Sequence, residues 1–206
     1  MAEDDDAALL QRWRDGDERA GSRLLERHVV RVSRFFRSKV AAAAEDLIQQ
    51  TFLACVEGRH RVRDGTSFSA YLFGAARNVL RAHLRAIDAD RKNLDFESQS
   101  IADLAPGAHT NLARRRDQRA VLEALRRIPL DLQIALEVVY WEGLSGAELA
   151  EVLEVPHPTA RSRLRRAKEL FEGEYDALQR EARLDTTGRG LTDWAAAIRD
   201  VARDDG

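Results

Sequence analysis

The sequence predicts an all-α protein with two small helical domains joined by a flexible polar linker. Apolar residues make up 44% of the 206 residues, which is enough for compact cores, whereas aromatic residues make up only 6%. Ala, Leu, Arg and Glu dominate the composition, and all four are strong helix formers. Apolar positions recur at helical spacing in two stretches, one on each side of a polar segment.

The first stretch, residues 1–87, is expected to form a small bundle of four helices. Apolar residues gather on one face of each predicted helix, which indicates a shared core. Gly58 is the expected end of the third helix, and a basic loop from Arg59 to Gly65 precedes the fourth. The predicted helices cover residues 6–14, 18–40, 44–57 and 67–86.

The helical pattern stops after this bundle and returns later in the chain. Residues 88–117 are expected to form the linker, because polar residues, Gly and Pro replace large apolar ones there. The second domain covers residues 118–183, where one helix ends at Pro129 and another is expected over residues 130–142. The rest, residues 184–206, is predicted to be a C-terminal tail with a short amphipathic helix.

The charge of the chain is nearly balanced but unevenly distributed. Thirty-three basic residues against 35 acidic ones give a formal net charge of −2, which argues mildly against permanent residence on DNA. Both ends are acidic, whereas basic residues cluster over residues 59–92 and 157–168. Local charge decides where a phosphate backbone docks, so the total does not exclude DNA contact.

The residue types that mark metal sites, disulfides and membrane segments are scarce or poorly placed. The single cysteine, Cys55, excludes an internal disulfide and is expected to be a small buried side chain. The histidines show no metal-ligand spacing, so neither a metal nor a cofactor is expected. The N-terminus lacks the apolar stretch of a signal peptide, and no run approaches the ~20 apolar residues that span a bilayer. We expect a cytoplasmic protein without membrane insertion.

The second domain contains the pattern of a helix-turn-helix motif. Ser145 and Glu148 are spaced as a capping box, which predicts a helix over residues 146–153. The segment Glu154-Val155-Pro156 has the length of the turn in this motif, and a second helix is expected to begin near His157. An α-helix fits the major groove of B-DNA, so this second helix is the candidate for reading DNA.

The second helix of the motif carries basic residues with no acidic residue among them up to Lys168. A basic helix face is often only a solvated face, but the capping box and short turn beside it favour DNA binding. The candidates for base contacts are Arg161, Ser162 and Arg165, because the N-terminal part of a recognition helix meets base edges. The candidates for phosphate contacts are Arg163, Arg166 and Lys168.

A longer set of residues surrounds and includes the helix-turn-helix pattern: Val121-Leu122-Glu123-Ala124-Leu125, Ile128-Pro129, Tyr140, Glu142-Gly143-Leu144-Ser145, Glu148-Leu149-Ala150, Val152-Leu153, Thr159, Arg161-Ser162-Arg163-Leu164 and Arg166-Ala167. Through this set, residues 121–171 resemble region 4 of the sigma-70 family of bacterial RNA polymerase sigma factors. The chain departs from the family at Glu154 and Pro158, where Gly is usual, and at Pro156, where a Ser-like cap is usual. These departures predict a stiffer turn.

Residues 44–85 resemble region 2 of the same family, and the two regions occur in the family's order. The matching residues are Ala44-Glu45-Asp46-Leu47-Ile48-Gln49-Gln50-Thr51-Phe52-Leu53, Phe68, Tyr71-Leu72 and Ala75-Ala76-Arg77-Asn78. Tyr71 stands where Trp is common. A polar linker without a third domain is typical of the extracytoplasmic-function (ECF) group.

The resemblance implies a sigma factor that binds core RNA polymerase and directs promoter-specific transcription initiation. It implies that the first domain binds the β′ clamp helices of the polymerase through Asp46, Gln49, Gln50 and Phe52. It also implies that the same domain contacts the −10 element through Arg61, Arg63, Thr66, Arg77, Asn78 and Arg81. The second domain would bind the β flap and read the −35 element, with Thr159 joining the candidates named above. An anti-sigma factor is a further expected partner.

Three other functions are compatible with parts of the sequence. A stand-alone helix-turn-helix transcription regulator would explain residues 121–171 equally well, but it would need a sensor or receiver domain that residues 1–86 do not indicate. A helical module that sequesters another factor would make no DNA contact. An enzyme is not favoured, because no Gly-rich phosphate loop or nucleophile motif occurs, and no small-molecule substrate is expected.

Overall fold

The computed structural model describes residues 5–62, 67–87, 94–104 and 116–181. Within these ranges every regular element is a helix, apart from an isolated β-bridge between Ser100 and Pro129. The predicted all-α class is confirmed. Among the helices described, none is long and apolar enough to cross a membrane. The predicted C-terminal tail falls outside the described residues from position 182 onward.

The first domain is a bundle whose helices begin and end close to the predicted boundaries. Asp5 accepts a hydrogen bond from the backbone N–H of Ala8 at 2.8 Å and so caps the first helix. Asp17 caps the second helix in the same way. The elements are α1 (Asp6–Arg14), α2 (Glu18–Val40), η1 (Ala41–Ala43), α3 (Ala44–Gly58), η2 (Arg59–Arg61) and α4 (Phe68–Ile87).

The second domain contains the predicted helix-turn-helix and one irregular turn. The helix expected over residues 130–142 is a shorter α-helix followed by a π-helical turn, and Gly143 ends it with φ +73°. The elements are α6 (Arg116–Arg127), α7 (Leu130–Leu136), η3 (Glu137–Trp141), α8 (Gly146–Leu153) and α9 (His157–Glu181).

Part of the predicted linker is folded and packed. Phe96, Ile101 and Leu104 are buried, and a short helix, α5 (Ile101–Leu104), follows the turn that starts near Asp95. Backbone N–H groups of Leu130 and Asp131 donate to the carbonyls of this segment at 2.9 and 3.1 Å. Residues 94–104 are therefore folded, unlike the expected flexible linker, because their apolar side chains are buried in the hydrophobic core that includes the first domain.

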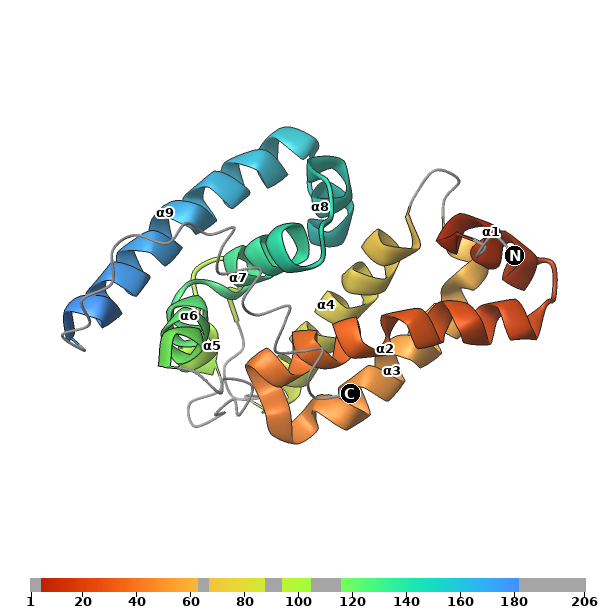
Figure 1. Cartoon of the computed structure of the whole chain (residues 1–206), viewed down its shortest axis with the longest axis horizontal. Helices are drawn as coiled ribbons and strands as arrows, with labels where there is room; N and C mark the ends of the chain where they lie inside the picture. The colour runs from red at the N-terminus through yellow and green to blue at the C-terminus, as the bar shows by residue number, and fades with distance from the viewer. Residues whose placement is uncertain (1–4, 63–66, 88–93, 105–115, 182–206) are drawn as a thin grey trace.

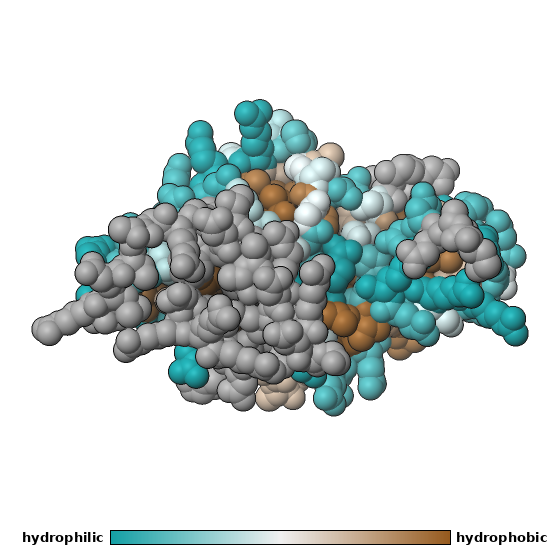
Figure 2. Space-filling model, viewed as in Figure 1, coloured by the Kyte–Doolittle hydropathy of each residue, from teal (hydrophilic) through white to brown (hydrophobic). Residues whose placement is uncertain are grey.

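The two domains lie against each other, and α4 of the first contacts α8 of the second, while α7 contributes to both cores (Figure 1). Every residue of α7 is buried. Leu132 and Leu136 belong to the core of the second domain, whereas Leu130 and Ile134 belong to a core that continues into the first domain. Because it is buried on all sides, α7 packs against the cores of both domains. On the face shown in Figure 2, polar residues cover most of the described surface, and apolar residues gather near the middle.

Candidate nucleic-acid and polymerase interfaces

The helix-turn-helix begins at the predicted capping box. The Ser145 hydroxyl accepts from the backbone N–H of Glu148 at 3.3 Å, and the Glu148 carboxylate accepts from the backbone N–H of Ser145 at 2.7 Å. This reciprocal pair satisfies backbone groups that a helix start leaves without partners. Leu149 and Leu153 are buried and anchor α8 to the core.

The turn between α8 and α9 contains a residue in an uncommon backbone conformation. Glu154 has φ 56° and ψ 42°, the left-handed region that favours glycine. Among the described residues it is the one non-glycine residue with positive φ. Its carboxylate accepts a hydrogen bond from the Asn78 side chain at 3.1 Å, so the turn touches α4 of the first domain.

The start of α9 presents a basic face to solvent. Ala160 and Ala167 are fully buried, which fixes the opposite side of the helix outward. Arg161, Arg165 and Arg166 are exposed, and we call these three residues the recognition face. The Arg165 side chain is 79% exposed and lies 3.8 Å from Glu169, a surface pair of little energetic weight. The structure therefore leaves these guanidinium groups accessible to a ligand.

The other predicted −35 residues lie in different surroundings. Ser162 is exposed, and its hydroxyl donates to the carbonyl of Thr159 at 2.9 Å. The side chain of Arg163 is only 17% exposed and lies 2.5 Å from the Glu97 carboxylate, in the packed linker segment. Lys168 lies over the ring of Tyr140 at 5.1 Å. Sequence reasoning did not predict the contact between Arg163 and Glu97.

The predicted −10 residues that the structure describes lie along α4 and just before it. Arg77 is only 2% exposed, and it donates to both carboxylate oxygens of Asp131 at 3.1 and 3.0 Å. Arg81 lies 3.8 Å from the same carboxylate. Arg61 and Asn78 are exposed. Arg63 and Thr66 fall outside the described residues. We call Arg77, Asn78 and Arg81 the −10 face.

The predicted polymerase-binding residues share one side of α3. Asp46, Gln49 and Gln50 are exposed, and Phe52 is half-buried. We call these four residues the polymerase face, after the contact that the sequence predicts for them. Beside them, Leu53 is 57% exposed, although it is a large apolar side chain. Leu53 lies outside the apolar stripe of the helix, which is a sequence signal for an exposed apolar side chain. Sequence reasoning did not select it as a binding residue.

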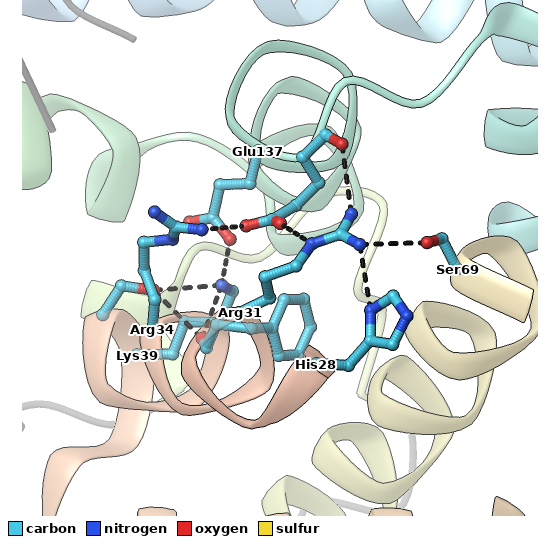
Figure 3. A network of polar contacts seen from close by, with 9 residues as sticks. His28, Arg31, Arg34, Lys39, Ser69 and Glu137 are labelled. Carbon is cyan, nitrogen blue, oxygen red and sulfur yellow. Dashed lines mark hydrogen bonds and ion pairs between the residues drawn. The ribbon is translucent and has the colours of Figure 1, made fainter. Parts of the chain in front are cut away.

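A polar network joins α2 to the second domain (Figure 3). His28 lies 2.8 Å from Asp6, and its Nδ1 lies 2.9 Å from Nη1 of Arg31. A guanidinium only donates, so Nδ1 accepts and Nε2 carries the proton. Burial, and next the charge of Arg31, lower the pKa of His28 below its ordinary value of 6.5. Arg31 also donates to Ser69 at 3.0 Å and to the Glu142 carboxylate.

Lys39 and Glu137 form an ion pair in which both side chains are buried (Figure 3). The two side chains are 0% and 2% exposed. Desolvation lowers the pKa of Lys39 and raises the pKa of Glu137, because burial penalises each charged form. Gln133 donates to Glu137 at 2.8 Å, and Lys39 donates to the carbonyl of Phe35 at 2.9 Å. Sequence reasoning missed this pair.

A cleft of about 1050 Å³ lies between α3, α4 and the turn of the helix-turn-helix. Its lining includes Gln50 from the polymerase face, Asn78 from the −10 face, and Glu154 and Val155 from the turn. In the part of the chain that is described, no three His, Cys, Asp or Glu side chains are grouped as metal ligands. The single cysteine, Cys55, is buried as predicted, and desolvation raises its pKa to about 12.

Comparison with known proteins places this geometry in a family. The family model for sigma-70 region 2 matches residues 23–89, and the model for sigma-70 region 4 matches residues 118–170. The sigma factor CarQ of Myxococcus xanthus is 34% identical over 166 residues, which cover 78% of this chain and 91% of that protein. The ECF sigma-E factor of Haemophilus influenzae is 27% identical over 182 residues, which cover 84% and 96%.

The same fold occurs in a solved structure. The sigma factor RpoE of Bartonella quintana, in complex with the anti-sigma factor NepR, matches with a TM-score of 0.53 and 23% identity. The match covers 77% of this chain and 94% of that one. The chain belongs to the sigma-70 family, in its ECF group, and it is an RNA polymerase sigma factor that directs promoter-specific transcription initiation.

Proposed function

We propose that the two domains of this sigma factor divide promoter recognition between them. The recognition face of α9 meets the −35 element, where Arg161 and Arg165, together with Ser162, contact base edges and Arg166 contacts a phosphate. Arg163 and Lys168 are further phosphate contacts, and Thr159 lies beside them. The −10 face of α4, together with Arg61, Arg63 and Thr66, meets the −10 element. Sigma factors are non-catalytic initiation factors, so no substrate chemistry is required of either face.

The observation that carries the proposal is the exposure of three guanidinium groups on the first turns of α9. An Arg side chain donates two hydrogen bonds to the O6 and N7 atoms of guanine in the major groove. Ala160 and Ala167 are buried, so this side of the helix packs on its domain, and the capping box satisfies backbone groups at the start of the preceding helix. A helix that is anchored on one side and presents accessible Arg residues on the other suits base reading in the major groove.

We assign the polymerase face of α3 to the β′ clamp helices and the second domain to the β flap. The exposed Leu53 extends the polymerase face with an apolar side chain. The buried centre of a protein interface is more apolar than its polar rim, and a few central residues supply most of the affinity. The polymerase then contributes much of the DNA affinity, which agrees with the net charge of −2.

We also assign an anti-sigma factor as a partner, since a protein of the same fold is a sigma factor bound to one. Binding to RNA polymerase and promoter DNA requires the protein to be in the compartment that holds both, so we place it in the cytoplasm.

Reconstitution with bacterial core RNA polymerase tests the proposed function. The polymerase is incubated with the protein, and run-off transcripts are sequenced from a pool of genomic fragments. New transcripts whose start sites share upstream sequences at −35 and −10 would support the proposal and reveal both elements. Retained binding to duplex DNA without binding to core polymerase would instead indicate a stand-alone regulator.

A pair of matched substitutions tests the polymerase face. Leu53→Asp should weaken binding to core polymerase roughly tenfold or more, because it places a charge in the apolar part of an interface. Val30→Asp is the control, since Val30 is 53% exposed on α2 and lies outside the polymerase face. Equal effects of the two substitutions in a core-binding titration would contradict the assignment of this face.

A further inference from the structure

Arg14, the last residue of α1, binds the backbone of η2. Its Nε donates to the carbonyl of Arg59 at 3.2 Å, and its Nη2 donates to the carbonyl of Val62. These residues lie 45 and 48 positions further along the chain, at the start of η2 and just after it. The end of a helix leaves carbonyl groups without partners inside the helix. One guanidinium from α1 therefore satisfies the backbone on both sides of this turn.

α1 is itself fixed to the bundle next to Arg14. Trp13 is only 2% exposed and packs on Gly21 of α2, where the Cβ of any other residue would overlap the indole ring. Asp17 caps α2 and also lies 2.6 Å from the guanidinium of Arg12. Because the residues around Arg14 are held by α2, its guanidinium has a defined position from which to hold η2.

The two arginines of η2 have different surroundings. The Arg59 side chain turns inward, since its Nη1 donates to a carbonyl of α3 at 2.9 Å and its guanidinium lies 5.8 Å from the ring of Trp13. Arg61 is exposed, and the next residue, Val62, is only 4% exposed. Val62 is anchored by its side chain in the core and by Arg14 at its carbonyl. Arg61 therefore projects from a backbone that is fixed beside it.

α4 holds the other end of this region. Gly58, at the end of α3, packs on the Tyr71 hydroxyl, where a Cβ would overlap it. The same hydroxyl donates to the carbonyl of Ala54 at 3.4 Å. α4 also carries Asn78 of the −10 face, and Asn78 and Arg61 line the same cleft. The position of Arg61 relative to the −10 face is therefore set from α4 on one side and from α1 on the other.

A held backbone matters for an arginine that contacts DNA. Binding costs entropy when it has to order a backbone segment and a long side chain, and a segment that is already ordered avoids part of that cost. Contact residues also need supporting residues that fix their geometry. Arg14 provides such support to η2 while its own donors are used on protein carbonyls.

We propose that Arg14 is a positioning residue for promoter contact, which holds η2 so that Arg61 is presented to the −10 element. This inference rests on the proposed function of Arg61. Arg14 lies outside residues 23–89, the part of the chain that matches the region 2 family model. The inference therefore adds α1 to the elements on which promoter contact depends.

Hydrogen exchange on the free, full-length protein tests whether Arg14 holds η2. Arg14→Ala should speed amide exchange over residues 59–62 roughly tenfold, because a turn that has lost its partner opens more often. The amides of α2 and α9 should exchange as in wild type. Arg23→Ala, an exposed change on α2, is the control and should alter neither region. Unchanged exchange over residues 59–62, or an equal increase throughout the chain, would overturn the inference.

A double-mutant cycle in the reconstituted holoenzyme tests whether Arg14 acts through Arg61. On the promoter that run-off transcription identifies, Arg14→Ala and Arg61→Ala should each lower the transcription rate about five- to tenfold, and the double variant should lie within about twofold of the weaker single variant. Combined with Arg161→Ala on α9, Arg14→Ala should multiply the loss in full. A purely structural role would multiply with both partners, and that result would overturn the inference.

Arg14→Lys keeps the charge of Arg14 but lacks the planar fork that donates to two carbonyls. It should therefore behave like Arg14→Ala in both measurements, and it decides if Arg14→Ala fails to fold, as judged by circular dichroism. Wild-type transcription by Arg14→Lys would overturn the inference. Wild-type transcription by Arg61→Ala would refute the −10 contact of Arg61, and the role of Arg14 with it. Multiplied losses for Arg14→Ala and Arg61→Ala would refute the role of Arg14 alone.

Discussion

Nε of Arg31 lies 2.6 Å from the carboxylate of Glu142, which joins the middle of α2 to the end of the π-helical turn in the other domain. Arg34 contacts the second oxygen of Glu142 at 3.0 Å, and the Glu142 side chain is only 4% exposed. One carboxylate therefore binds two guanidinium groups at the domain contact.

We predict that Glu142→Gln destabilises the folded chain by about 1–3 kcal/mol, because two Arg side chains lose a charged acceptor in a partly buried site. Glu172→Gln is the control, since Glu172 is exposed on α9, and it should change stability by less than about 0.5 kcal/mol. Chemical denaturation measures both. A Glu142→Gln variant as stable as the control would show that this contact does not hold the domains.

The left-handed conformation of Glu154 predicts a substitution that stabilises the protein. Glu154→Gly should stabilise the second domain by about 0.5–1 kcal/mol, because glycine adopts φ 56° without a steric penalty. The lost hydrogen bond to Asn78 is exposed and offsets little of this gain. Glu151→Gly, three residues earlier in α8, should instead cost about 1 kcal/mol. The measurement is the thermal unfolding temperature of each variant. If both temperatures shift in the same direction, the backbone conformation of Glu154 does not explain the effect.

Most of the helix boundaries follow from local signals in the sequence. Ser145 and Glu148 specify a helix start wherever they stand, and Pro129 and Gly143 end helices through their own backbone preferences. The exposed positions of Arg161 and Arg165 follow equally from the spacing of Ala160 and Leu164. Such features need no knowledge of distant parts of the chain.

The domain contact depends on residues that are far apart in sequence. Arg77 and Asp131 are 54 positions apart, and Lys39 and Glu137 are 98 positions apart, so periodicity within one helix carries no information about either pair. A signal was nevertheless present. Asp131 and Glu137 are the charged residues in a mostly apolar stretch, and a charge in such a stretch needs a buried partner.

The pKa of His28 predicts a pH dependence of stability. The folded state holds His28 neutral and lowers its pKa, whereas the unfolded chain titrates near 6.5. The unfolded state therefore binds the proton more readily, so stability is full above pH 6.5 and falls as the pH drops below it. The loss amounts to at most about 1.4 kcal/mol for each pH unit between the two pKa values.

His28→Gln should reduce this pH dependence, because the amide can accept from Arg31 and donate to Asp6 but does not titrate in this range. The measurement is the free energy of unfolding at pH 7.5 and at pH 5.5 in both proteins. A wild-type protein that gains stability on acidification relative to His28→Gln would contradict the assigned protonation state.

The residues of α9 should separate into two classes when binding is measured against salt. Arg166→Ala should weaken binding to all duplex sequences alike and lower the salt slope by about one, as expected for a lost phosphate contact. Arg180→Ala, at the far end of the same helix, is the control and should change neither quantity. A defect in Arg166→Ala that is confined to one promoter sequence would instead make Arg166 a base contact.

The most direct test of the central claim is a double-mutant cycle between Arg165→Ala and single base-pair changes in the promoter that reconstitution identifies. Transcription rates are measured for wild type and variant on the native promoter, on −35 variants and on −10 variants. On the native promoter, Arg165→Ala should raise the activation free energy of transcription by about 1–3 kcal/mol. On a promoter changed at the one −35 base pair that Arg165 contacts, the substitution should cause no further loss. On every −10 variant, the two losses should add in full. Additive costs at every −35 position would contradict reading of the −35 element by α9.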